Sequence, residues 1–325
     1  MALLWALAGG ACLAQSDNEV FLFDDVLRPK TISQVECLAL PHAVWVAPRW
    51  VEAGFLGRKV DRSAQGCIRY FPSAKAQGAQ TAVFFIHGDV MGLEDHPDQN
   101  REVYEKTGSY KAQIAQADRT AKDIGLPVIR IARPGVYGST GMSHVRERRL
   151  PMEAYLVNAA ITTIKERYGY HRILLTGLSG GGGLVGAALT LGRTDTDCAV
   201  VGSGAVSMKT RARLLASKEA LRGLDQTGQL LSDVYDPIDH VNGVLPDSRR
   251  RIFVLGDPRD RSVAFESQQE FQQRLLSVGI PATLLTAEAK DAMHHRTAPE
   301  AQRVAAWCLA GVSDADIQNR LNAGP

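Results

Sequence analysis

The chain has 325 residues, with 37 basic and 35 acidic side chains and a formal net charge of +2. Its length suits one large α/β domain, or two small ones, with a sizeable buried core. The near balance of charge, without a long run of either sign, gives no support to a nucleic-acid or polyanion-binding protein.

The apolar N-terminus predicts export. Residues 1–14 are apolar, with small residues at Cys12 and Ala14 before a polar stretch. This pattern is typical of a secretory signal peptide, although it is short and has no Lys or Arg at its start. We therefore expect a periplasmic or secreted protein, with a lipid anchor on Cys12 or a buried N-terminal helix as the alternatives. No later segment is apolar for long enough to span a membrane.

Residues 15–80 predict an N-terminal extension with short strands. The apolar runs Ala43–Ala47 and Cys67–Phe71 are typical of edge strands. Four cysteines remain after the predicted signal peptide, an even number that fits disulfides in an oxidising compartment. We favour the pairs Cys37 with Cys67 and Cys198 with Cys308, and four small buried thiols are the alternative.

From residue 81 to residue 325, apolar runs alternate with helical periodicity. The predicted strands are Thr81–Ile86, Pro127–Ala132, Arg172–Thr176, Asp197–Gly202, Ile252–Gly256 and Ala282–Thr286. The predicted helices are Ser109–Ile124, Met152–Tyr168, Leu184–Leu189, Ala264–Val278 and Pro299–Ala310. Such alternation predicts an α/β fold with a mostly parallel, doubly wound sheet. Residues 207–249 break the alternation and predict a small cap or lid, with an ordinary crossover and long loop as the alternative.

The segment Gly177-Leu178-Ser179-Gly180-Gly181 lies between a predicted strand and a predicted helix. A serine at such a corner, flanked by glycines that allow a tight turn, predicts a nucleophile elbow. Gly181–Gly186 also matches the dinucleotide pattern G-x-G-x-x-G, but its first glycine comes several residues after the strand ends. No Lys follows the glycines, as it does in a P-loop, so we expect no cofactor.

A serine nucleophile needs a base and a carboxylate that orients the base. Asp260 follows the predicted strand Ile252–Gly256, and the nearby Asp257 is the competing candidate. His294 and His295 follow the next strand, and one of them is the expected base. Neighbouring histidines rarely bind one ion and no third ligand has metal-site spacing, so we predict no metal.

The order Ser179, Asp260, then His294 or His295 resembles that of the α/β-hydrolase fold enzymes. The resemblance extends from about residue 81 to the end of the predicted strands and helices. It implies an oxyanion hole made by the backbone N–H groups of Asp89 and Gly180, with the preceding His87 in a structural role.

The implied activity is that of a serine hydrolase acting on a small-molecule ester, with a peptidase as the nearest alternative and a catalytically silent binding protein as another. Arg133–Gly141 resembles the loop that shapes the floor of the pocket in these enzymes. Gly182 and Gly183 depart from the usual pattern, because we expect them to precede the helix. Residues 207–249 have no counterpart in the family and leave the choice of substrate open.

Overall fold

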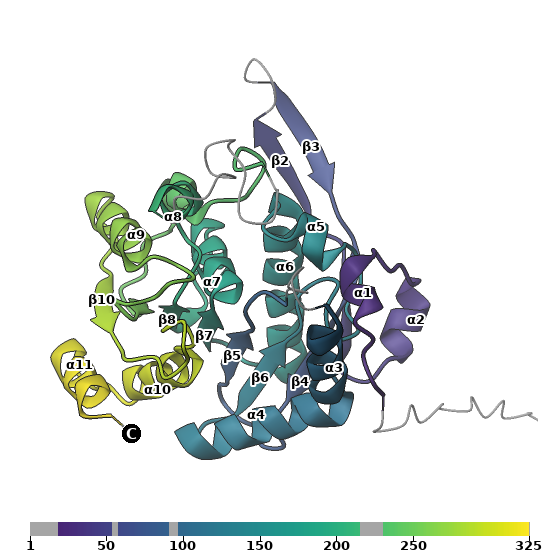
Figure 1. Cartoon of the computed structure of the whole chain (residues 1–325), viewed down its shortest axis with the longest axis horizontal. Coiled ribbons are helices and arrows are strands. Elements are labelled where there is room, and N and C mark those ends of the chain that lie inside the picture. Colours follow the sequence, from purple (N-terminus) through teal and green to yellow (C-terminus); the bar gives the residue numbers. More distant parts are fainter. Residues whose placement is uncertain (1–18, 54–57, 91–96, 215–229, 325) are drawn as a thin grey trace, which may run out of the picture.

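Figure 1 shows a computed structural model of the protein, which describes residues 19–53, 58–90, 97–214 and 230–324. Within these residues, eight strands form one sheet in the order β1-β4-β6-β5-β7-β8-β9-β10. They are β1 (Ala43–Val46), β4 (Gly66–Pro72), β5 (Val83–Ile86), β6 (Val128–Ile131), β7 (Ile173–Leu178), β8 (Thr196–Gly202), β9 (Arg251–Gly256) and β10 (Thr283–Thr286). The strands from β6 to β10 in this order pair parallel, and only β1 and β4 are antiparallel to their neighbours. The predicted mostly parallel sheet is confirmed.

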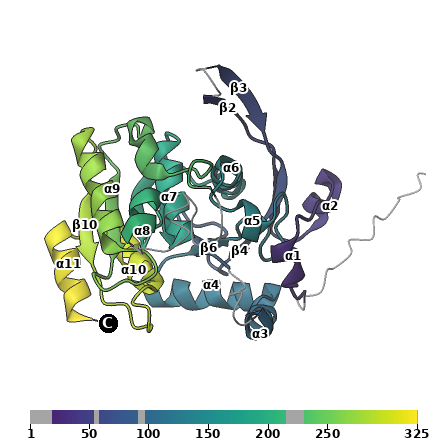
Figure 2. The same ribbon diagram turned by 45° about the horizontal axis from the view of Figure 1, so that its top comes forward.

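Helices cover both faces of the sheet (Figure 2). One face carries α6 (Pro151–Tyr168), α7 (Gly180–Thr190) and α9 (Phe265–Ser277), and the other carries α4 (Tyr110–Ile124), α10 (Ala298–Leu309) and α11 (Asp314–Ala323). The cause is the alternation of side chains along each strand, since successive residues point to opposite faces. In β8, Ala199 and Val201 join the cluster under α6 and α7, whereas Cys198 and Val200 join the cluster under α10.

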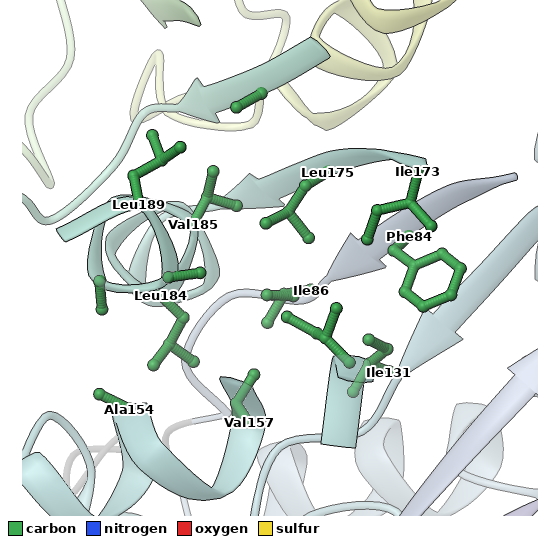
Figure 3. Close-up of a cluster of buried hydrophobic side chains, with 14 of the residues drawn as sticks. Phe84, Ile86, Ile131, Ala154, Val157, Ile173, Leu175, Leu184, Val185 and Leu189 are labelled. Carbon is green, nitrogen blue, oxygen red and sulfur yellow. The ribbon is translucent and has the colours of Figure 1, made fainter. Parts of the chain in front are cut away.

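The larger core lies between the sheet and the helix that follows Ser179. Figure 3 shows Val185 of α7 turned toward Leu175 of β7, and Leu184 turned toward Ala154 and Val157 of α6. Leu184, Val185 and Leu189 of α7 all belong to this core. All three are buried. This packing holds α7 against the sheet and so fixes the direction in which the helix leaves the end of β7.

Shorter elements complete the described chain. They are α1 (Asp24–Leu27), α2 (Gln34–Ala39), α3 (Pro97–Thr107), α5 (His144–Glu147), α8 (Met208–Leu214), the 3-10 helix η3 (Pro237–Gly243) and the hairpin strands β2 (Arg49–Ala53) and β3 (Lys59–Ser63). The sequence prediction ended with the helix that is α10 and missed α11. That helix begins at a capping signal, because the side chain of Ser313 accepts a hydrogen bond from the backbone N–H of Asp316 at 3.1 Å.

The N-terminal extension is part of the main sheet. β1 is an edge strand as expected, but the prediction of an edge strand at Cys67–Phe71 is wrong, because β4 lies between β1 and β6 with every residue buried. The strand carries Arg69, a residue that suits an exposed edge. The structure buries this guanidinium and pairs it with the carboxylate of Glu19 at 3.0 Å.

Two disulfides join distant elements. Cys37 pairs with Cys67, which links α2 to β4, and Cys198 pairs with Cys308, which links β8 to α10. These are the pairs that the sequence favoured. The predicted signal peptide, residues 1–14 with Cys12, lies outside the described residues and stays a prediction. In the described part of the chain, no helix combines the length and hydropathy needed to cross a membrane.

The segment 207–249 contains α8 and η3, and its residues 215–229 lie outside the described part of the chain. The described remainder packs on the helix that follows Ser179. The backbone N–H of Tyr235 donates to the carbonyl oxygen of Arg149 at 2.7 Å, and its hydroxyl lies 3.0 Å from Oγ1 of Thr190 in α7. A lid formed by this segment stays a prediction, as does the division of the chain at residues 14 and 80.

Candidate active site

Ser179 occupies a strained corner between β7 and α7. Its backbone dihedral angles are φ 56° and ψ −121°, in a region that residues with a side chain rarely adopt. Three backbone hydrogen bonds hold it there: its N–H donates to Gly202 at 2.9 Å, and its carbonyl oxygen accepts from Gly183 at 2.9 Å and from Ala205 at 3.1 Å. The corner is the geometry of a nucleophile elbow.

The glycines around the corner allow the chain to pack closely. A Cβ atom at Gly177 would lie 2.2 Å from the carbonyl oxygen of Gly181. One at Gly182 would lie 2.7 Å from the carbonyl oxygen of Gly202, at the end of the next strand. The expectation that Gly182 and Gly183 precede the helix is wrong, because α7 begins at Gly180. These glycines instead let the first turn of α7 lie directly against the 202–205 segment.

Asp260 and His295 form a hydrogen-bonded pair. Asp260 follows β9, and one carboxylate oxygen accepts from the backbone N–H groups of Ser262 at 2.8 Å and Val263 at 2.9 Å. The other oxygen lies 2.8 Å from Nδ1 of His295, in the loop between β10 and α10. A carboxylate only accepts, so Nδ1 carries the proton in this contact and Nε2 of a neutral ring is left as a proton acceptor.

His294 has a different environment. Its Nδ1 lies 3.7 Å from the carboxylate of Asp257, beyond hydrogen-bond range, and makes no hydrogen bond within the described residues. The carboxylate of Asp257 is occupied elsewhere, by the guanidinium of Arg259 and the backbone N–H of Ala289. Of the two neighbouring histidines, His295 therefore has the geometry of a base held by a carboxylate.

The loop that carries His295 meets the Ser179 corner through β8. Gly202, which accepts the N–H of Ser179, is followed by Ser203, whose Oγ lies 2.9 Å from Oγ1 of Thr297. The N–H of Thr297 in turn donates to the carbonyl oxygen of His295 at 3.0 Å. In the described part of the chain no hydrogen bond joins Oγ of Ser179 to His295, and such contacts are often long in free enzymes.

The segment after β5 faces the same corner. A Cβ atom at Gly88 would lie 3.3 Å from Cβ of Ser179. His87 before it is buried, with Nδ1 donating to the carbonyl oxygen of Gly88 at 2.7 Å and Nε2 accepting from the N–H of Arg133 at 3.2 Å. Burial, aided by the charge of Arg133, lowers the pKa of His87 to about 3. The ring is therefore neutral and fixed in position, as expected of a structural residue.

Asp89 begins a buried network of charges beside Gly180. Its carboxylate accepts from Arg133 at 2.6 Å, lies 3.5 Å from Nε of Arg148, and contacts the guanidinium of Arg149. Burial raises the pKa of Asp89, but the three guanidinium groups outweigh it and hold the pKa well below its ordinary value. A Cβ atom at Gly180 would lie 2.0 Å from this carboxylate, so the network touches the residue after Ser179.

Most residues of this network carry no pattern that predicts a site from the sequence. Glu153 is fully buried and accepts from Nε of Arg133 at 2.7 Å and from the backbone N–H of Arg149 at 2.6 Å. The signal was an acid within the apolar stripe of α6, next to Ala154, Leu156 and Val157. A charge in such a stripe requires a partner from another element.

Two further features of the described residues concern metal ligands and cavities. Among the described residues, no three His, Cys, Asp or Glu side chains gather as a metal site requires. A cavity of about 730 Å³ opens beside Asp257 and Arg259, but none of the residues of the Ser179 corner, from Gly177 to Gly183, lines it. The carboxyl ends of the strands carry the Ser179 hydroxyl, after β7, and the hydrogen-bonded pair of Asp260 and His295, after β9 and β10.

No protein-family model and no curated protein matches the chain. Among solved structures, Est1E from Butyrivibrio proteoclasticus is 14% identical, with a TM-score of 0.52 over 76% of this chain and 95% of that one for the form with bound ferulic acid. A second Est1E structure gives 14% identity and a TM-score of 0.51, with 81% and 98% covered. The protein thus has the α/β-hydrolase fold.

An acylaminoacyl peptidase from Pyrococcus horikoshii is 15% identical with a TM-score of 0.47. The match covers 80% of this chain but only 39% of the length of the peptidase. This chain therefore spans well under half of that protein.

Proposed function

We propose that the protein is a serine hydrolase that cleaves a carboxylic ester through an acyl-enzyme. Ser179 is the nucleophile, His295 the base, and Asp260 the carboxylate that orients the base. One observation carries the proposal: the 2.8 Å contact between His295 and Asp260 lies at the same end of the sheet as a serine held at φ 56°. The likeness to Est1E supports a hydrolase on this fold.

The proposed reaction has two halves: formation of an acyl-enzyme on Ser179 and its hydrolysis by water. Oγ of Ser179 attacks the ester carbonyl carbon and its proton passes to Nε2 of His295. The carbonyl oxygen becomes an oxyanion, which the backbone N–H groups of Gly180 and Asp89 stabilise by roughly 3 kcal/mol per donor. The C–O bond then breaks, the alcohol leaves with the proton from His295, and water releases the acid by the same steps in reverse.

The charge network supports this role for the Asp89 loop. A buried carboxylate beside an oxyanion would repel it, and the Asp89 side chain reaches Gly180. Arg133, Arg148 and Arg149 surround that carboxylate and offset its charge. The loop is thereby anchored next to Ser179 without leaving an uncompensated negative charge at the proposed oxyanion hole.

Fluorophosphonate labelling tests the nucleophile. We expect the parent protein to be labelled and to hydrolyse p-nitrophenyl acetate, and Ser179→Ala to lose both activities while it unfolds at the same temperature. His295→Ala should lower kcat about 10³-fold and His294→Ala far less, because a base acts with its nucleophile as a unit. Equal labelling of Ser179→Ala would refute the assignment. A peptide p-nitroanilide in the same assay tests the peptidase alternative.

We also infer that the protein is exported. Two disulfides are stable in the periplasm or outside the cell and rare in a reducing cytosol. Protein made with its leader should release a mature chain into an oxidising compartment. Thiol titration of that denatured, unreduced chain should find no free thiol at Cys37, Cys67, Cys198 or Cys308, and four free thiols would contradict export.

A further inference from the structure

A small cavity lies against the Ser179 corner, between α6, α7 and α8. Its volume is about 20 Å³. The apolar part of its wall consists of Leu150, Ala154, Leu184, Ala187, Ala205 and Met208. A volume of about 10–15 Å³, measured in the same way, is enough to hold one water molecule. The cavity therefore fits one group about the size of a methyl.

The cavity adjoins the nucleophile through two backbone contacts. Gly180, the residue after Ser179, lines it, and so does Ala205, whose N–H donates to the carbonyl oxygen of Ser179 at 3.1 Å. An acyl group bound to Oγ of Ser179 has its carbonyl oxygen at the N–H of Gly180. Ser179 does not line the cavity itself, so the alkyl end of the acyl group reaches it past Gly180.

Polar side chains in the wall are already engaged. Glu153 accepts from Arg133 and from the backbone N–H of Arg149, and the hydroxyl of Tyr235 lies 3.0 Å from Oγ1 of Thr190. Arg149 contacts the carboxylate of Asp89. Six of the eleven wall residues have apolar side chains and two are glycines, which favours a hydrocarbon end over a polar one.

We propose that this cavity is the acyl site and that the substrate is an acetyl ester. The proposal rests on the proposed function of Ser179 as the nucleophile. The acetyl methyl group fills the available space. A longer acyl chain meets Met208 and Leu184, which are buried and line the cavity.

A chain-length series tests the size of the acyl site. We expect kcat/KM for p-nitrophenyl acetate to exceed that for the butyrate at least tenfold, after correction for the uncatalysed rates, with the octanoate lower still. Butyrate or octanoate turnover as fast as acetate turnover, in protein that fluorophosphonate labels at Ser179, would overturn the acetyl site alone. Absence of both labelling and ester turnover would overturn the proposed function as well.

Met208→Ala is the matching variant, because it removes the long side chain from the wall and leaves a good helix former in α8. The ratio of butyrate to acetate kcat/KM should rise about tenfold. Val234→Ala is the control: Val234 packs in the same apolar cluster as Met208 but does not line the cavity, so the ratio should not change. An unchanged ratio in folded Met208→Ala would overturn the proposal.

A second variant keeps the test decisive if Met208→Ala fails to fold. Ala187→Val places two methyl groups into the same space from α7, where Ala187 is buried and lines the cavity. Acetate turnover should fall at least tenfold. Full acetate turnover by folded Ala187→Val would show that the acetyl methyl lies elsewhere.

Discussion

The substitution Asp260→Asn removes the charge of the carboxylate but keeps nearly the same side-chain shape. One oxygen of Asp260 accepts from Ser262 and Val263, and the other faces Nδ1 of His295 at 2.8 Å. Asparagine keeps the first oxygen, so the loop retains its form, but it presents an NH₂ group to Nδ1. The imidazole must then carry its proton on Nε2, where it cannot accept the proton of a serine.

We therefore expect Asp260→Asn to lower kcat about 10³- to 10⁴-fold, which corresponds to about 4–5.5 kcal/mol of lost transition-state stabilisation. Steady-state hydrolysis of p-nitrophenyl acetate measures this loss, and thermal unfolding checks that the fold is unchanged. Asp257→Asn is the matched control, because this carboxylate is equally buried but lies 3.7 Å from its histidine. A variant Asp260→Asn with more than about a tenth of the parent rate, or an equally inactive Asp257→Asn, would refute the pairing.

Two further predictions concern stability. Burial raises the pKa of Asp236 to about 7. Between about pH 4 and pH 7 the folded state therefore keeps this proton, whereas the unfolded chain, with a pKa near 4, has lost it. The free energy of unfolding then falls by at most about 4 kcal/mol as the pH rises from 4 to 8. Asp236→Asn should match the parent at pH 4 and resist urea better at pH 8, and equal midpoints at pH 8 would contradict this. Serine at Cys198 and Cys308, 110 residues apart, should cost about 5 kcal/mol in urea unfolding, against about 3.5 kcal/mol for Cys37 and Cys67, 30 residues apart.

Local patterns predicted the sheet because a strand buried on both faces has a continuous apolar run. β5 and β7 were found this way, and the glycines beside Ser179 marked the turn between β7 and α7. The same reasoning failed at β4, because the short run Cys67–Phe71 predicted an edge strand, whereas β4 lies inside the sheet with Arg69 buried. Its partner Glu19 lies 50 positions earlier in the chain, and no local pattern connects the two.

The candidate site also has a part that the sequence predicted and a part that it did not. Asp260 and the two histidines follow predicted strands, so chain order and the parallel sheet brought them to one edge. The choice between His294 and His295 depends on side-chain directions, and His294 has a positive φ of 54° that no periodicity anticipates. The network around Asp89 was missed because Arg133, Arg148 and Glu153 come from separate elements that only the fold brings together.

The two disulfides imply an order of events during synthesis. Cys37 lies in α2 and Cys67 in β4, which pairs directly with β1, so this bond needs only the first part of the chain. Cys198 must wait for Cys308, 110 residues later, which at about 5–20 residues per second is a delay of roughly 5–20 s. Throughout that interval Cys198 lacks its native partner, whereas Cys37 and Cys67 can already pair. An oxidant that acts on thiols in the order in which they are synthesised therefore forms the native pairs. A slower oxidant allows non-native pairs, which a disulfide isomerase would then have to exchange.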